Sequence, residues 1–293
     1  MAQSVLVRFP VGKRAMITVV LAAHFLLSMA VAEPAVAEDQ KQPLVKSVMI
    51  ESGMLASVET AAAIRDEEMK RLAATRGPIT ARELAAVRAR MMASIRVKHL
   101  LDQIEVHLNS NFSTSQLQTV LDGLRSPTIE KSRLIKGRVS DAHFDEQIRA
   151  YHLRLIEKPP RESRVELMRQ LATVERINGL NTIVKVEVRK SLLTAITHVK
   201  DNLIPTEQEL DRQLTRFRKQ VDDKSGKENL EKYLYLFRAI SSPELNKMIN
   251  DYRHSGLESV LSSCETRLKK EFSAARQQHN RVLSAKESAL VRR

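Results

Sequence analysis

The sequence predicts an all-α protein, built as a bundle of antiparallel helical hairpins. Apolar residues recur at helical spacing along most of the chain, and only eight glycines and nine prolines occur among its 293 residues. Several segments begin with Ser or Thr followed three residues later by Glu or Gln, which is the pattern of a helix capping box. The chain has no Trp and only 4% aromatic residues, so we expect an aliphatic core.

The first 32 residues follow the order of a secretory signal peptide. Lys13 and Arg14 end a basic start without acidic residues, and residues 15–32 form an apolar run. Small-residue cleavage sites end at Ala32 and Ala37. We therefore expect removal of this segment and a periplasmic location in a Gram-negative bacterium. The alternative is a retained inner-membrane anchor, although the run is at the short limit of a spanning helix, about 20 residues.

Residues 33–43 are polar, contain two prolines, and are expected to form a flexible leader. The first helical half follows over residues 44–157 and opens with a loose apolar stripe. Thr80 with Glu83 then predicts a capping box, because each side chain can satisfy a free backbone N–H of the other. The apolar stripe of the helix that starts there continues to Leu108.

Two further helices are expected in this half. Ser113 with Gln116 caps the first, which ends before Pro127 because the residue preceding a proline is disfavoured in helical geometry. The second is expected over residues 128–156. The double proline at 159–160 then marks the boundary between the halves.

The second helical half covers residues 161–285 and opens with a long helical stripe. One local pattern disagrees, since Val184 to Val188 alternates as a strand would. A lone strand has no partner in a chain otherwise predicted to lack strands. We therefore expect a helix here, with a kink near Gly179.

The remainder of this half contains another capped start and a polar break. Thr206 with Glu209 repeats the earlier capping pattern. Residues 222–229 are expected to form a polar loop, and Pro243 stands at a first-turn position, where its missing N–H is tolerated. Residues 286–293 are expected to form a frayed basic tail.

Residues 112–132 and 240–260 look like two copies of one helical unit. Their apolar spacing agrees, and four aligned pairs are identical, namely Leu117/Leu245, Ser113/Ser241, Arg125/Arg253 and Glu130/Glu258. This internal repeat predicts two similar helical halves, with both leucines buried.

The first copy also carries a family resemblance. Its segment Phe112-Ser113-Thr114-Ser115-Gln116-Leu117, followed by Leu124-Arg125-Ser126-Pro127, resembles the signature of the bacterial exported helical proteins grouped as domain of unknown function 2059. The chain departs from that pattern at Ile129, where the family usually has Gly, and at Leu124, where it usually has an aromatic residue. The resemblance covers residues 90–275 and implies an exported helical protein without a known activity.

The chain is basic, and removal of the first 32 residues leaves 45 basic and 35 acidic side chains, a net charge of +10 at pH 7. This charge favours an acidic envelope polymer, anionic lipid or another envelope protein as partner. The candidate anionic-partner surface consists of Arg267, Lys269, Lys270, Arg276 and Arg281. The alternative is a set of solvated helix faces, because Lys and Arg alternate with Glu and Asp. Nucleic acid is not expected, because few aromatic residues are available to stack on bases.

The sequence contains no phosphate-binding Gly-rich loop, zinc-protease motif or nucleophile elbow. Two loose groups could contact a metal, and they are His99 with Asp102, and Asp141 with His143 and Glu146. A ligand pair without a third is a weak signal, and solvated histidines near helix surfaces explain both groups, so no metal or cofactor is expected. Cys264 is the only cysteine and is expected to be a buried, inert thiol; a disulfide-linked dimer is the alternative.

These patterns favour a non-enzymatic binding or scaffold module, monomeric or homodimeric, in the periplasm or at the envelope. The first alternative is a carrier that shelters an apolar ligand, such as a lipid or acyl chain, between the two halves. The second is an envelope enzyme without a recognisable motif. A solid core with a charged groove would favour the module, a continuous apolar cavity the carrier, and three or more polar side chains converging in a cleft the enzyme.

Overall fold

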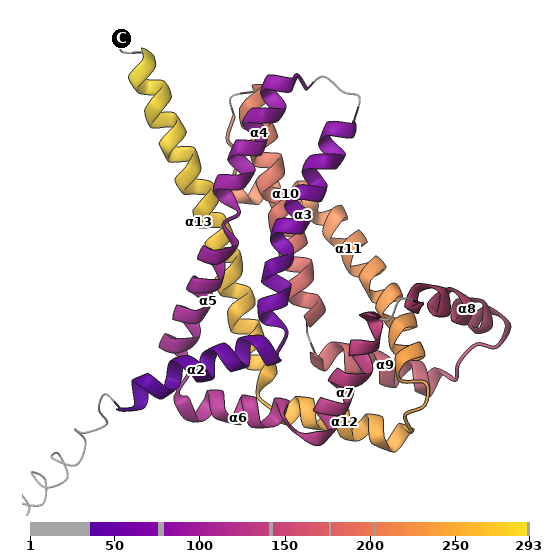
Figure 1. The fold of residues 1–293 in the computed structure, drawn as a ribbon. Coiled ribbons are helices and arrows are strands. Elements are labelled where there is room, and N and C mark those ends of the chain that lie inside the picture. Colours follow the sequence, from indigo (N-terminus) through magenta and orange to yellow (C-terminus); the bar gives the residue numbers. More distant parts are fainter. Residues whose placement is uncertain (1–35, 76–78, 141–142, 176, 202, 292–293) are drawn as a thin grey trace, which may run out of the picture. The chain divides into compact units, whose positions relative to one another are not determined.

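The computed structural model describes residues 36–75, 79–140, 143–175, 177–201 and 203–291 (Figure 1). Most of this part of the chain is helical and no strand occurs in it, which confirms the all-α class. The helices are α2 (Val36–Glu51), α3 (Met54–Ala74), α4 (Ala81–Ser94), α5 (Val97–Asn111), α6 (Thr114–Leu124), α7 (Pro127–Gly137), η1 (Arg138–Ser140, a 3-10 helix), α8 (Phe144–Glu157), α9 (Glu162–Glu175), α10 (Ile177–Asp201), α11 (Glu207–Leu236), α12 (Ser242–His254) and α13 (Leu257–Val291).

The chain divides into two compact units, Met1–Lys41 and Gln42–Arg293. The predicted signal peptide lies outside the described residues. The expected leader does not end at residue 43, because α2 begins at Val36 and contains Pro43. A proline removes one helical hydrogen bond. Val45 and Val48, which follow it, are fully buried, and their packing holds the helix.

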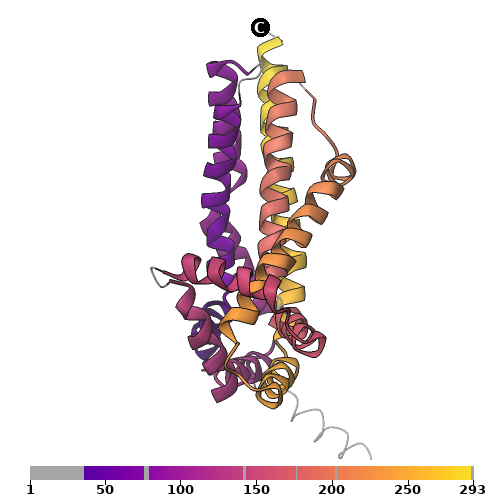
Figure 2. The same cartoon turned by 90° about the vertical axis from the view of Figure 1, so that its right-hand side faces the viewer.

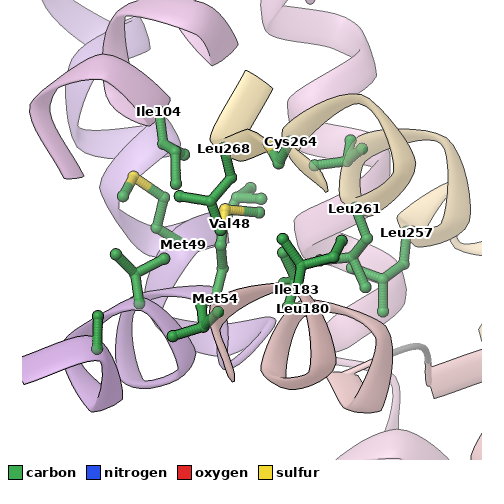
Figure 3. Packing of buried hydrophobic residues seen from close by; sticks show 14 of the residues in the cluster. Val48, Met49, Met54, Ile104, Leu180, Ile183, Leu257, Leu261, Cys264 and Leu268 are labelled. Carbon is green, nitrogen blue, oxygen red and sulfur yellow. The ribbon is translucent and has the colours of Figure 1, made fainter. Parts of the chain in front are cut away.

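The core of the second unit is shared by both predicted halves. Helix α10 packs along α3 and α4, and also contacts α11 and α13, while α13 packs on α4 and α5. Figure 2 shows α3 to α5 beside α10 and α13. In Figure 3, side chains from α2, α3, α5, α10 and α13 point toward one another, and they include Val48, Met54, Ile104, Leu180, Leu261, Cys264 and Leu268. The segments on either side of the double proline thus fold around one aliphatic core.

The predicted helix starts agree with the structure. Thr80 and Thr206 form capping boxes with Glu83 and Glu209, and each threonine hydroxyl accepts from the glutamate backbone N–H at 3.2 Å. Ser113 likewise caps α6. The segment of alternating valines lies inside α10 and is helical, as expected. The double proline lies in the break between α8 and α9.

Two expected boundaries are wrong. The stripe that starts at Thr80 forms two helices rather than one, because α4 ends at Ser94, whose hydroxyl donates to the Arg90 carbonyl at 3.0 Å and competes with helical hydrogen bonding. Residues 128–156 form α7, η1 and α8. Helix α13 extends to Val291, and fraying of residues 286–293 stays a prediction.

The expected polar loop at 222–229 is also wrong, because α11 runs through it without a break. Gly226 and its polar neighbours indicated a loop. A Cβ at Gly226 would meet nothing within 4 Å, so this part of the helix faces open space. Polar residues are therefore expected on it, and one glycine weakens a helix by only about 1 kcal/mol.

The two segments of the predicted repeat follow the same order of helices. In each, a capped helix (α6 or α12) ends at a short break and a second helix (α7 or α13) follows. Leu117 and Leu245 are both fully buried. The copies also touch: a Cβ at Gly123 in α6 would lie 2.5 Å from the Ser255 Cβ, in the break after α12. The internal repeat and the similarity of the two halves stay predictions.

Within the described chain, no single helix combines the length and the apolar composition of a membrane span. One bent pair, Lys41–Glu51 with Met54–Ala74 at 63°, meets both criteria together.

Candidate binding groove

The candidate anionic-partner surface does not form one exposed cluster. Lys269 and Lys270 are exposed on α13, but Arg267 is partly buried and pairs with Glu271 at 2.8 Å. Arg276 is only 3% exposed, so its place in the predicted surface is wrong. The side chain of Arg281 lies outside the described part of the chain.

Arg276 instead closes a buried charge cluster between α10, α11 and α13. Its guanidinium donates to the Glu207 carboxylate through two nitrogens, at 2.9 and 2.8 Å, and to Glu187 at 2.8 Å. Lys190 adds contacts to the same glutamates at 3.3 Å and to Asp211 at 2.8 Å. A buried charge is tolerated when it is paired and hydrogen-bonded. The cluster therefore fixes the first turn of α11 to α10 and α13.

The pKa values of this cluster follow its pairing. Burial by itself raises the pKa of Glu207, but the charge of Arg276, its hydrogen bonds and Lys190 lower it overall. Burial by itself lowers the pKa of Lys190, and the hydrogen bond to Asp211 with the nearby carboxylates raises it overall. Both groups are therefore held in their charged forms, as a structural clamp requires.

The two loose groups of possible metal ligands have other contacts in the structure. His99 lies 3.6 Å from Glu271, whereas Asp102 pairs with Lys98 at 2.7 Å. His143 contacts Glu146 at 3.3 Å. Asp141 lies outside the described residues, among which no set of three His, Cys, Asp or Glu side chains could hold a metal ion.

The Cys264 thiol is fully buried, as expected. Burial, with the neighbouring Glu265 charge, raises the pKa of Cys264 to about 12. A thiol with such a pKa is protonated at neutral pH and is therefore a poor nucleophile. This environment favours a role in packing for Cys264.

A serine, a histidine and an asparagine converge between α5 and α13, which sequence reasoning missed because Ser263 is 156 positions from His107. The His107 Nε2 lies 2.7 Å from the Ser263 hydroxyl, and Nδ1 lies 3.0 Å from the Asn111 amide nitrogen. That amide also donates to the His107 carbonyl at 2.8 Å, so its nitrogen faces the ring and Nδ1 must accept. Nε2 then carries the proton and donates to the hydroxyl.

This tautomer is the opposite of the one that activates a serine, because a general base must accept the hydroxyl proton. Burial, followed by the charges of Arg267 and Lys270, lowers the pKa of His107, so the ring is neutral near pH 7. In the described arrangement the three side chains therefore form a hydrogen-bonded link between two helices.

A groove opens between α3, α10 and α11, with a volume of about 530 Å³. Its lining comes from both predicted halves of the chain, and comprises Ala63, Ile64, Glu67, Glu68, Arg71, Lys185, Phe217, Gln220, Val221, Lys224 and Glu228. Helix α11 starts beside the middle of α10 and runs obliquely away from it (Figure 1). The groove occupies the space between the middle of α11 and α3.

Each wall presents its groove residues at helical spacing. On α11, Phe217 and Val221 are one turn apart and provide apolar surface. On α3, Ile64 provides apolar surface opposite them, one turn before Glu68. Sequence reasoning did not single out Phe217 as a candidate site residue. It stands between Arg216 and Arg218, which are exposed, so the segment reads as a polar helix surface.

Most charges at the groove are paired with one another. Arg71 contacts Glu67 at 3.1 Å and Glu68 at 4.0 Å. Arg189 also pairs with Glu68, and its guanidinium carbon lies 5.7 Å from the centre of the Phe217 ring. Lys224 contacts Glu228, one turn along α11, at 3.7 Å.

Lys185 is the exception. Its side chain is partly buried in the groove lining, on α10. It makes no ion pair or hydrogen bond with any side chain that the structure describes. The groove therefore combines an apolar wall, a rim of mutually neutralised charges and one cation without a described partner.

A second hollow, of about 290 Å³, shares Glu68, Arg71 and Phe217 with the groove. Its other lining residues are mainly apolar and include Leu72, Leu192, Leu193 and Ile196. The hollow extends the apolar surface from Phe217 along α3 and α10.

Comparison of the chain with protein-family models, curated proteins and solved structures found no match. The resemblance to domain of unknown function 2059 therefore stays a prediction.

Proposed function

We propose that this chain is an exported, non-enzymatic binding module and that the groove between α3, α10 and α11 is its ligand site. The observation that carries the proposal is the groove itself, with Phe217 and Ile64 facing a concave space of about 530 Å³. Ligand sites are typically concave, mostly apolar and between about 300 and 1,000 Å³ in volume. The signal-like first 32 residues support export.

The polar clusters outside the groove support structural roles better than catalytic ones. Arg276 and its carboxylate partners neutralise one another, and His107 carries its proton on the wrong nitrogen for a base. Arg71 and Lys224 in the groove lining likewise form ion pairs with glutamates on their own helices. These arrangements favour binding over a reaction.

The carrier alternative gains support from the origin of the lining. The two walls come from α3 in the first half and α11 in the second half, so a ligand there would lie between the halves. This placement matches the expectation for a carrier of an apolar ligand. The binding module and the carrier both require a ligand in the groove, so an experiment on groove binding tests both.

The test uses the neutral dye Nile red, whose fluorescence rises in apolar surroundings, as a probe of the full chain. Ala63 is exposed on α3 and lines the groove, so Ala63→Trp should fill it and remove most of the fluorescence gain. Ala56 is exposed on the same helix outside the groove, and Ala56→Trp is the matched control. Equal dye binding by both variants would contradict the proposal, provided that circular dichroism shows unchanged helicity.

A further inference from the structure

We infer that the ligand of the groove is a fatty acid, a single acyl chain that ends in one carboxylate. Its carboxylate would pair with the Lys185 ammonium and its chain would lie on Phe217, Ile64 and Val221. The inference rests on the proposed function, since it names the ligand class of the same groove.

The charge of the ligand follows from the pairing at the groove. Arg71, Arg189 and Lys224 are each engaged by a glutamate. The Lys185 side chain is partly buried, yet it has no ion-pair or hydrogen-bond partner among the described side chains. An anion within hydrogen-bonding distance would stabilise this ammonium. A hydrogen bond between two charged groups is stronger than one between two neutral groups.

A single negative charge fits better than two. Glu67, Glu68 and Glu228 lie in the same lining and would repel a dianionic phosphate. The lining offers no second cation without a carboxylate partner among its described residues. A carboxylate satisfies Lys185 with one charge and leaves the rim pairs intact.

The shape of the apolar surface favours a chain over a compact ring system. The surface begins at Ile64 and Val221, passes Phe217, and continues into the neighbouring hollow toward Leu193 and Ile196. An extended chain can follow this line of residues between α3 and α10. Each methylene that it buries adds a similar gain in affinity.

The experiment measures displacement of Nile red from the full chain by octanoate, decanoate and dodecanoate, with isothermal titration calorimetry as a second readout. Affinity should rise by up to about fourfold for each added methylene until the chain extends past the apolar surface. Dodecanol, which has the same length without the charge, should bind at least about tenfold more weakly than dodecanoate, as expected for loss of a charged hydrogen bond.

Two lysine variants test whether the ligand requires the charge of Lys185 itself or only a positive charge somewhere in the groove. Lys185→Met keeps the stem and removes the ammonium, and should weaken dodecanoate binding at least about tenfold while dodecanol binding stays the same. Lys224→Met removes a groove cation that is already paired with Glu228, and should change dodecanoate binding by less than about threefold.

The outcomes distinguish this inference from the proposed function. Equal binding of dodecanol and dodecanoate, or an unaffected Lys185→Met variant, would overturn the inference while the Nile red result with Ala63→Trp still supports the groove. Tighter binding of dodecyl phosphate than of dodecanoate would assign the site to a phosphate amphiphile instead. Dye binding that falls as protein concentration rises would assign the groove to a second copy of the chain.

Discussion

The two ends of α11 are held by carboxylates in different ways. At the N-terminal end, Glu207 belongs to the helix and pairs with Arg276 and Lys190. At the C-terminal end, Tyr233 belongs to the helix and donates to the Glu175 carboxylate of α9, which also accepts from Lys136 at 2.9 Å. We call these contacts the N-terminal clamp and the C-terminal clamp. The N-terminal clamp consists of ion pairs, whereas the C-terminal clamp combines one ion pair with hydrogen bonds from hydroxyl groups.

The second clamp is the more enclosed. Glu175 is 3% exposed and also accepts from the Ser132 hydroxyl at 3.2 Å. Burial, with the Glu175 charge and hydrogen bond, raises the pKa of Tyr233 well above its usual value. Between the two clamps, the middle of α11 lines the groove. A wall fixed at both ends can leave space beneath its middle, and in this chain that space is the groove.

The largest effect is expected at the N-terminal clamp. Arg276→Met would leave the buried Glu187 carboxylate without its strongest partner, and should lower the free energy of unfolding by about 3–5 kcal/mol in urea denaturation. The exposed Lys270 on the same helix is the control, and Lys270→Met should change stability by less than about 0.5 kcal/mol. Similar values for the two variants would show that Arg276 does not clamp α11.

A smaller loss is expected at the C-terminal clamp. Tyr233→Phe removes one donor from the buried Glu175 carboxylate and should lower the free energy of unfolding by about 1–3 kcal/mol. Tyr235→Phe, two positions along α11, removes a hydroxyl that donates to the exposed Gln147 and should have less effect. If chemical denaturation ranks the two variants in the opposite order, the buried network is not the main support of this end.

The middle of α11 should gain stability from a substitution. Gly226→Ala adds a methyl group into open space and should raise the free energy of unfolding by about 0.5–1 kcal/mol. Gly256 is the contrasting case, because its φ of 72° strains any other residue, and Gly256→Ala should destabilise the fold. Destabilisation by Gly226→Ala would indicate that this segment is not the regular helix described.

The smallest effect is a pH dependence confined to the N-terminal clamp. The folded-state pKa of Glu207 is lowered, so its contribution is present above its unfolded value, near 4.5, and is lost as pH falls through the folded value. The difference in stability between wild type and Glu207→Gln should shrink as the pH is lowered from 6 to 3. It should not exceed about 1 kcal/mol, since this carboxylate is about one-third exposed. A constant difference across this range would contradict an ionic clamp.

The fold class and many helix starts could be predicted because their causes are local. Thr80 and Glu83 satisfy each other within one turn, and the apolar stripes around Leu117 and Leu245 need no knowledge of the rest of the chain. The burial of Cys264 followed in the same way from Leu261 and Leu268 at helical spacing. Local chemistry of this kind is available in any short window of sequence.

The groove and the buried charges could not be predicted, because their partners are distant. Arg276 has the sequence context of a surface residue, and only Glu187, 89 positions earlier, makes it internal. Phe217 and Ile64 face one space although 153 positions separate them. The same limit explains the wrong loop near Gly226, since polar residues suit a turn and an exposed helix equally well.

The position of α13 at the end of the described chain determines when the fold can be completed. Its Leu261, Leu268 and Phe272 side chains are fully buried in contact with helices that emerge from the ribosome much earlier. Contacts such as His107 with Ser263 close loops of more than 150 residues, and long loops slow folding. The nascent chain therefore cannot finish this core until α13 has been synthesised.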